Sequence, residues 1–331
     1  MGAATILGCA GLRLSRDERD FFKDAAPWGF ILFARNVEDA GQVSALTSEL
    51  RDSVGFDAPI LIDQEGGRVQ RLRGPIWREW HPPLDQMARG GAEAMRLRYR
   101  LIAHELRAIG IDVNCAPQAD VARADTHPFL RNRCYGEDAA TVTEAALAVA
   151  DGLMEGGVLP VVKHIPGHGA GIVDSHHDLP HVTQDRATLE QVDFAPFRAL
   201  SHLPLGMTAH ILYDALGHTW PATMDAEMIS LIRDEIGFQG ALMTDDLSMN
   251  ALPGTIGERA ARAKAAGVDL VLHCNGELAE MEDVVTESGP LDGPSESRAD
   301  AALAWRKAPD PLDIPATEAA LSGLLDGEVY V

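Results

Sequence analysis

The sequence has few cysteines, and their spacing excludes two classes of protein. The four cysteines, Cys9, Cys115, Cys134 and Cys274, are spread over 331 residues, and no two of them form a CxxC pair. A disulfide-stapled scaffold has more cysteines in a shorter chain, and a cysteine-based zinc site has them in close pairs. We therefore expect all four to be buried free thiols.

Basic residues are also scarce. Lysine and arginine total 28 against 50 aspartates and glutamates, which gives a net charge of −22. Such a surface repels nucleic acids and anionic membranes, so neither is expected as a partner. An anionic substrate would need arginine or lysine in its pocket to offset this negative field.

Long apolar runs are missing as well. No stretch is long enough to cross a bilayer, and the first ten residues lack the basic segment of a secretory signal. We therefore expect a cytoplasmic protein. No linker divides the chain, so residues 1–331 are predicted to form one domain, with a short C-terminal appendage over about 289–331.

What the sequence does contain is a regular alternation of short apolar runs and longer amphipathic segments. The runs predict eight strands, at residues 4–10, 29–34, 59–63, 111–117, 159–164, 205–210, 241–246 and 269–275. Helices are predicted at 38–52, 94–109, 139–155, 224–236, 256–266 and 316–325. This order predicts an α/β fold, a single-domain (β/α)8 barrel of the TIM type. An open doubly wound sheet is the alternative, but only a poor version of its glycine-rich turn follows the first run.

Nearly all the predicted strands turn polar where they end. Asp63 ends the third run, Lys163 and His164 end the fifth, His210 ends the sixth, and Asp245 lies at the end of the seventh. The carboxyl ends of barrel strands meet on one face, which holds the active site in such enzymes. The sequence therefore predicts a catalytic site on this face.

The stretch VVKHIPGHGAGIVDSHHDLP, residues 161–180, has two interpretations. His164 and His168 have the spacing of an HExxH zinc motif, but a proline and two glycines exclude the regular helix that this motif needs. A loop could still bind a metal. On the other interpretation, Asp174 orients His176, whose imidazole can give and take a proton near neutral pH.

Two further motifs carry charged side chains. Asp245 could be a nucleophile, a metal ligand or a helix cap, although Asp246 is the more natural cap. Asp63 is suited to accept hydrogen bonds from two sugar hydroxyls. Arg71 is one of three arginines that follow Asp63, and Arg133 lies in a second basic loop.

Together these motifs resemble those of the β-N-acetylglucosaminidases of glycoside hydrolase family 3, bacterial cytoplasmic enzymes of peptidoglycan recycling. The similar segments occur in the order found in that family. They are DQEGGRVQRL (63–72), RNRCYG (131–136), KHIPGHG (163–169) with DSH (174–176), MTAHILY (207–213) and MTDDLSM (243–249).

The resemblance implies roles that the residues alone leave open. It implies that Asp245 is the nucleophile, that His176 is the general acid/base and that Asp174 is the partner of His176. The positions implied to bind the terminal N-acetylglucosamine are Asp63, Arg71, Arg133, Lys163, His164 and, in a less defined role, His210.

The implied reaction is a retaining double displacement through a covalent glycosyl-enzyme. Its implied substrates are muropeptide fragments, in which N-acetylglucosamine is linked to 1,6-anhydro-N-acetylmuramic acid with or without a peptide. No cofactor or metal is expected, and the protein is expected to be a monomer. The alternatives are a family 3 glycosidase or phosphorylase with another sugar preference, a sugar-binding barrel without catalytic activity (a silent sugar-binding barrel), and a metallohydrolase using His164, His168 and Asp245.

Overall fold

The structure is a computed structural model, which describes residues 2–171, 173 and 178–331. Within these residues, eight parallel strands form one sheet, and each falls on one of the predicted apolar runs. They are β1 (Thr5–Gly8), β2 (Gly29–Leu32), β3 (Ile60–Ile62), β6 (Val113–Asn114), β7 (Leu159–Ile165), β9 (Leu205–Thr208), β11 (Ala241–Met243) and β12 (Val271–His273).

The sheet closes on itself. The hydrogen-bonded strand order is β11-β9-β7-β6-β3-β2-β1-β12. A parallel bridge between Met243 and Leu270 joins the two end strands, and the Thr244 N–H donates to the Leu270 carbonyl at 3.0 Å. The predicted (β/α)8 barrel is therefore confirmed, and the open doubly wound sheet is excluded.

Buried apolar side chains form two layers, because successive residues of a strand point to opposite faces. Ile6, Leu61 and Val161 belong to a cluster inside the barrel. Their neighbours Leu7 and Ile62 belong to a second cluster that packs against the surrounding helices. Strands buried on both faces explain why the apolar runs in the sequence are continuous rather than alternating.

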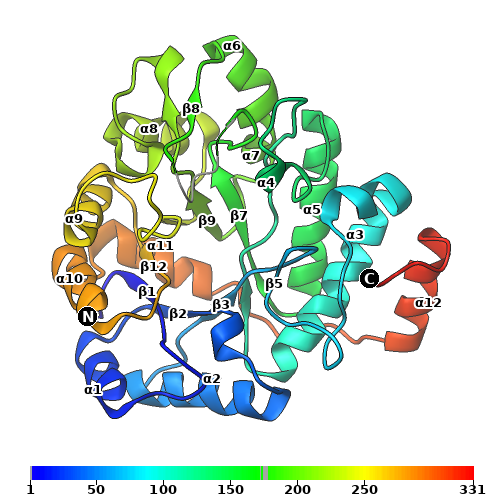
Figure 1. Ribbon diagram of the computed structural model, residues 1–331, viewed down its shortest axis with the longest axis horizontal. Coiled ribbons are helices and arrows are strands. Elements are labelled where there is room, and N and C mark those ends of the chain that lie inside the picture. The colour runs from blue at the N-terminus through cyan, green and yellow to red at the C-terminus, as the bar shows by residue number, and fades with distance from the viewer. Residues whose placement is uncertain (1, 172, 174–177) are drawn as a thin grey trace.

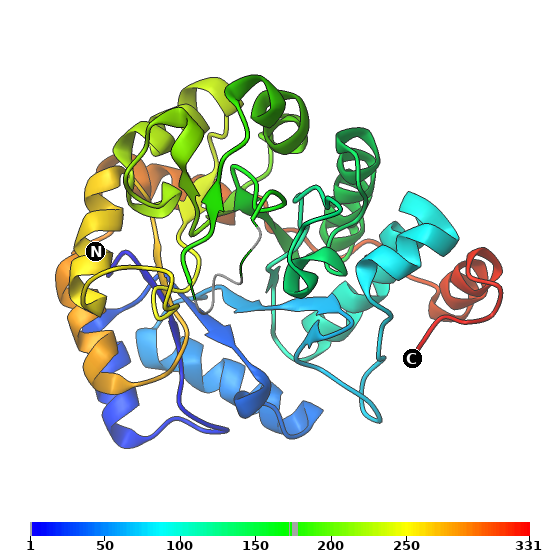
Figure 2. The same ribbon diagram turned by 45° about the horizontal axis from the view of Figure 1, so that its top comes forward.

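Helices surround the barrel (Figure 1), and the turned view shows them outside the strands (Figure 2). The longer ones up to residue 266 are α1 (Arg16–Ala25), α2 (Ala40–Val54), α3 (Pro83–Ala108), α5 (Ala139–Glu155) and α9 (Ile256–Ala266). Short helices are α4 (Pro128–Arg131), α6 (Arg186–Thr188), α7 (Phe194–Ala199) and α8 (Ala226–Ser230), and α8 continues as a π-helix over Leu231–Ile236. The last three are α10 (Leu278–Ser288), α11 (Gly293–Leu303) and α12 (Ile314–Leu324).

Most predicted helix bounds agree with the structure, and the differences have local causes. The N-cap Asp39 accepts a hydrogen bond from the Gln42 N–H, so α2 begins two residues later than predicted. Helix α3 begins before the predicted residue 94 because a kink at Gly91, where φ is 63°, joins two helical halves. Helices α1 and α10 were not predicted.

Four short strands at the carboxyl ends of the barrel strands were not predicted either. β4 (Gln64–Gly66) pairs antiparallel with β5 (Val69–Gln70), directly after β3. β8 (His181–Val182) pairs in parallel with β10 (Leu212–Tyr213), and so joins the loops that follow β7 and β9. Both pairs add ordered backbone around the face where the polar strand ends meet.

The segment predicted as an appendage packs onto the barrel. Ala299 and Ala302 of α11 are buried in the interior cluster, beside residues at the amino ends of the strands. Asp269, which precedes β12, accepts hydrogen bonds from Arg298 at 2.6 Å and from Ser295 at 2.8 Å. Helix α11 therefore closes the end of the barrel opposite the polar strand ends. Helix α12 lies against α3 at the edge of the molecule (Figure 1).

The structure also bears on the membrane prediction. None of the helices among the described residues combines the length and the apolar character that a membrane span requires.

Candidate active site

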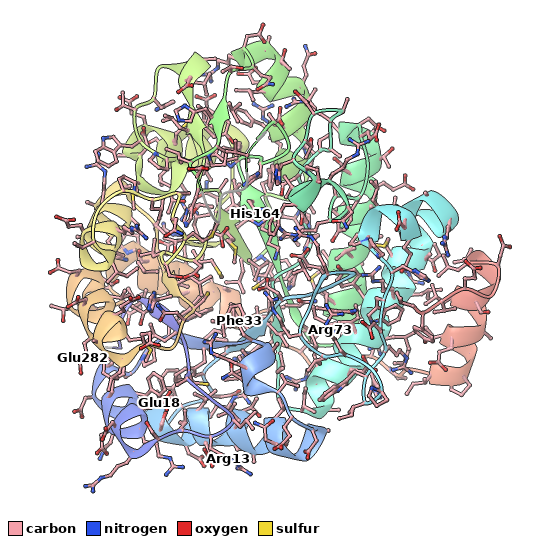
Figure 3. The ribbon with its side chains drawn as sticks, in the orientation of Figure 1. Arg13, Glu18, Phe33, Arg73, His164 and Glu282 are labelled. Atoms are coloured by element: carbon pink, nitrogen blue, oxygen red, sulfur yellow. The ribbon has the colours of Figure 1, made fainter. Side chains whose placement is uncertain are left out.

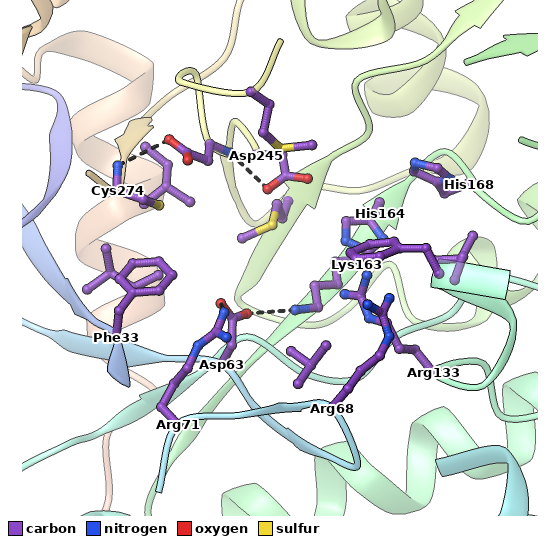
Figure 4. A pocket seen from close by; sticks show the side chains of 18 residues that line it. Phe33, Asp63, Arg68, Arg71, Arg133, Lys163, His164, His168, Asp245 and Cys274 are labelled. Carbon is purple, nitrogen blue, oxygen red and sulfur yellow. Dashed lines mark hydrogen bonds and ion pairs between the residues drawn. The ribbon is translucent and has the colours of Figure 1, made fainter. Parts of the chain in front are cut away.

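A cavity of about 250 Å³ lies at the carboxyl ends of the barrel strands (Figure 4). In the side-chain view, Phe33 and His164 lie toward the middle of the barrel, whereas Arg13 and Glu282 lie at its outside (Figure 3). The polar lining residues are Asp63, Arg68, Arg71, Arg133, Lys163, His164, His168, Asp245 and Asp246. The apolar ones are Ile31, Phe33, Val69, Phe129, Leu130, Met207, Met249, Leu272 and Cys274.

Asp63, directly after β3, is held by two cations. Its Oδ1 accepts a hydrogen bond from Lys163 Nζ at 2.9 Å, and its Oδ2 accepts one from Arg71 Nη2 at 2.9 Å. Burial alone raises the pKa of Asp63, but Lys163 and Arg71 outweigh it and hold that pKa well below its usual range. Asp63 is therefore an ionised hydrogen-bond acceptor at neutral pH.

Glu65 was not singled out in the sequence, yet it orients two of the predicted sugar-binding residues. It is buried, its Oε1 lies 2.6 Å from Lys163 Nζ, and it accepts two hydrogen bonds from Arg133 at 2.8 and 2.9 Å. Burial raises the pKa of Glu65, but Arg133 and Lys163 lower it to about 2. Burial likewise lowers the pKa of Lys163, and Asp63 and Glu65 reverse that effect to a net rise. Lys163 is thus charged inside the protein because both carboxylates face it.

Asp245 follows β11 and faces the cavity. Its Oδ1 accepts a hydrogen bond from the Asp246 N–H at 2.8 Å. Burial raises the pKa of Asp245, but the nearby His164 and His210 lower it below its ordinary value. Asp245 is therefore a half-buried carboxylate anion without a lysine or arginine bonded to it among the described residues. A carboxylate that is ionised, faces the cavity and is not paired with a cation is suited to act as a nucleophile.

Asp246 and His210 shape the turn that carries Asp245. Asp246 Oδ1 accepts hydrogen bonds from the N–H groups of Ser248 and Cys274, both at 3.1 Å, as expected of a capping residue. His210 is fully buried and is not among the cavity-lining residues, and its Nε2 lies 3.0 Å from the Asp246 carbonyl oxygen. His210 thus supports the turn from behind.

His164, at the end of β7, is held by a second carboxylate that the sequence did not reveal. Its Nδ1 lies 2.7 Å from Oδ2 of the buried Asp120. The neighbouring His168 also lines the cavity, and its ring centroid lies 5.6 Å from that of His164. Burial, followed by the proximity of His164, lowers the pKa of His168 to about 4, so His168 is neutral at neutral pH.

The cavity brings together six of the nine predicted site residues: Asp63, Arg71, Arg133, Lys163, His164 and Asp245. His210 is not a lining residue and lies behind Asp246, which does line the cavity. The predicted acid/base His176 and its partner Asp174 lie outside the described residues.

Two features of the sequence could have pointed to Glu65 and Asp120, the carboxylates that the sequence analysis missed. Glu65 is two residues after Asp63, the spacing of side chains on one face of a strand, and Asp120 ends the polar segment after the fourth run.

The structure offers little to the metal hypothesis. Across residues 2–171, 173 and 178–331, no group of three or more histidine, cysteine, aspartate or glutamate side chains is placed to hold a metal ion. His164, a residue of the metallohydrolase alternative, has its Nδ1 2.7 Å from Asp120 Oδ2.

Sequence comparison relates most of the chain to one family. Residues 5–301 match the glycosyl hydrolase family 3 N terminal domain. A protein named Beta-hexosaminidase from Methylococcus capsulatus is 37% identical over 307 residues, which cover 89% of this chain and 90% of that protein.

Comparison with solved structures agrees. NagZ from Neisseria gonorrhoeae, in complex with N-trifluoroacetyl-D-glucosamine, is similar with a TM-score of 0.83 and 30% identity, over 98% of both chains. A glycoside hydrolase family 3 β-N-acetylglucosaminidase from Paenibacillus has a TM-score of 0.86 and 31% identity, over 97% of this chain and 66% of that one. The family expected from the motifs is thus confirmed, and the chain belongs to glycosyl hydrolase family 3.

Proposed function

We propose that this glycoside hydrolase is a retaining β-N-acetylhexosaminidase that removes a terminal non-reducing N-acetylglucosamine from peptidoglycan fragments. The observation that carries the proposal is the ionised, half-buried Asp245 in the same small cavity as the network of Asp63, Lys163 and Arg71. The similar protein from Methylococcus capsulatus is named Beta-hexosaminidase, and the similar NagZ structure holds an N-acylated glucosamine, which supports the sugar assignment.

The size and polarity of the cavity favour one sugar residue. Its volume of about 250 Å³ is slightly below the range of typical small-molecule sites, which span roughly 300–1,000 Å³. Asp63 offers carboxylate oxygens, while Lys163 and Arg71 offer N–H donors beside them. Each hydroxyl of a sugar ring can both donate and accept a hydrogen bond. Two neighbouring hydroxyls can therefore donate to the carboxylate of Asp63 and accept from Lys163 and Arg71.

In the first step of the proposed reaction, Asp245 attacks the anomeric carbon. The bond from that carbon to the leaving oxygen breaks, and His176 gives its proton to that oxygen. The sugar is then bound to Asp245 through an ester. Because Asp245 is ionised at neutral pH, it needs no base to become nucleophilic.

In the second step, a water molecule attacks the same carbon from the side that the leaving group vacated. His176 takes the proton of that water, and the bond to Asp245 breaks. Two inversions leave the released N-acetylglucosamine with its original β configuration. Asp174 is proposed to hold His176 in the orientation that both steps need.

The natural substrate is proposed to be N-acetylglucosamine linked to 1,6-anhydro-N-acetylmuramic acid, with or without a peptide, acted on in the cytoplasm. Such fragments carry carboxylates, which the net charge of −22 repels. Arg68, Arg71, Arg133 and Lys163 line the cavity and place positive charge where the substrate binds. Three of them, Arg71, Arg133 and Lys163, are paired with Asp63 or Glu65.

The test is hydrolysis of 4-nitrophenyl β-N-acetylglucosaminide by the purified protein, beside the matching β-glucoside, with and without a chelator. We expect chelator-resistant release of nitrophenol from the N-acetyl sugar alone. Release from neither sugar would support the silent sugar-binding barrel. Inhibition by the chelator that zinc reverses would support the metallohydrolase, and N-acetylglucosamine 1-phosphate as the product in phosphate buffer would identify a phosphorylase.

A further inference from the structure

Asp120 lies outside the cavity lining, yet its two oxygens hold both ends of the turn that carries His164 and His168. The loop after β6 runs beside β7, where the Ala119 N–H donates to the Lys163 carbonyl at 2.7 Å. This pairing places the buried Asp120 next to His164, whose Nδ1 lies 2.7 Å from Asp120 Oδ2. Asp120 Oδ1 accepts a hydrogen bond from the backbone N–H of His168 at 2.6 Å.

These contacts determine which ring nitrogen of His164 carries the proton. Burial raises the pKa of Asp120, but His164 and the His168 N–H outweigh it, and the net shift is downward. Asp120 is therefore ionised at neutral pH and can only accept hydrogen bonds. His164 Nδ1 must then be the donor, and in the neutral ring Nε2 is left as an acceptor.

The free edge of the ring is the one available to the substrate. His164 lines the cavity and Asp120 does not, so we infer that the Nδ1 edge faces the protein and the opposite edge faces the cavity. An acceptor at this position can bind a sugar hydroxyl, which donates, and would repel a second acceptor placed there.

We propose that Asp120 is a positioning residue that holds His164 in the Nδ1–H tautomer, so that its Nε2 accepts a hydrogen bond from the bound sugar. The effect on activity rests on the proposed hexosaminidase function, whereas the tautomer itself does not depend on it.

Asp120→Asn separates this role from simple packing. An asparagine keeps the size of the aspartate but replaces one acceptor oxygen by an NH2 group. If its remaining oxygen keeps the His168 N–H, the NH2 faces His164 Nδ1, which then has to become an acceptor. The ring is expected to switch to the Nε2–H tautomer and present a donor to the sugar.

The experiment reads the tautomer directly, by ¹⁵N–¹H NMR of protein labelled at histidine nitrogens, at a pH where the ring is neutral. His164→Gln identifies the His164 signals by their loss. We expect Nδ1–H in the wild type and Nε2–H in Asp120→Asn. A wild-type ring in the Nε2–H form would overturn the proposal, and this measurement needs no variant of Asp120 to fold.

Activity gives the second readout, with Asp112→Asn as the matched control. Asp112 is also buried, accepts the Ile60 N–H at 2.8 Å and lies 3.4 Å from Arg51, but it is at the opposite end of β6. We expect kcat/KM of Asp120→Asn to fall about 10- to 100-fold, as for other carboxylates that orient a functional histidine, and Asp112→Asn to stay near the wild type. An unchanged tautomer in Asp120→Asn, or equal losses in the two variants, would overturn the proposal. If the wild type hydrolyses no N-acetylglucosaminide, the proposed function fails while the tautomer result still stands.

Discussion

Asp63 and Asp245 are two ionised carboxylates in one cavity, and their partners fit them for different roles. Both oxygens of Asp63 are held by cations, which fixes its orientation and supports the proposal that it binds the sugar. Asp245 has one oxygen bonded to the N–H of its own turn. One partner of Asp63, Lys163, is 100 residues away along the chain, so the sequence could place both carboxylates at strand ends without distinguishing their surroundings.

At the residue scale, Glu65→Gln is expected to lower stability in a pH-dependent way. The folded-state pKa of Glu65 is about 2, below its ordinary value of 4.5. Its stabilising contribution is therefore complete above pH 4.5 and is lost as the pH falls from 4.5 toward 2. The free energy of unfolding at pH 7 should fall by about 3 kcal/mol. Urea denaturation at a series of pH values measures this, and a difference from the wild type that does not shrink below pH 4.5 would contradict it.

The acid/base prediction is also tested at the residue scale. His176→Ala should slow the cleavage of substrates with poor leaving groups by about 10²- to 10⁴-fold, because those groups depart only when protonated. Aryl glycosides with very acidic phenols should be slowed much less. The adjacent His177→Ala is the control and should leave both rates near the wild type. Equal slowing of both substrate types in His176→Ala would mean that His176 is not the acid.

At the scale of elements, the apolar runs predicted all eight barrel strands because each strand is buried on both faces. The helices were harder to predict. The merging of two helices at Gly91 depends on packing, and the short pairs β4–β5 and β8–β10 are too brief to leave a pattern. The carboxylates of Glu65 and Asp120 contact side chains 44 or more residues away, so only the positions of these two residues near strand ends could be predicted.

The role of α11 leads to a prediction about elements. Asp269→Ala removes a buried carboxylate that Arg233 and Arg298 contact at 2.6 Å, and so detaches α11 from the barrel. The free energy of unfolding should fall by about 3–5 kcal/mol. kcat/KM of the folded protein should not change, because the site lies at the other end of the strands. Chemical denaturation and steady-state kinetics check the two parts, with Ser295→Ala as a milder control. Lost activity at unchanged stability would contradict this view of α11.

At the scale of the whole molecule, composition predicted a strongly acidic surface, and the structure gathers four basic side chains in one cavity. The surface should still slow the approach of an anionic muropeptide. We expect its kcat/KM to rise several-fold as salt increases from about 0.01 to 0.3 M, because the Debye length shortens from about 30 Å to below 10 Å. The neutral 4-nitrophenyl sugar should show no such rise. A fall in kcat/KM for the anionic substrate would mean that the cavity cations dominate at long range.

The most direct test of the central claim is to trap the sugar on the nucleophile. A 5-fluoro analogue of N-acetylglucosaminyl fluoride should form the glycosyl-enzyme and release it slowly, and mass spectrometry of the digested protein then locates the ester. The account predicts one sugar per chain, on the peptide that carries Asp245, and none on Asp245→Ala. A label on another residue, or turnover of the analogue with no covalent adduct at any time, would contradict the assignment of Asp245 as the nucleophile of a double displacement.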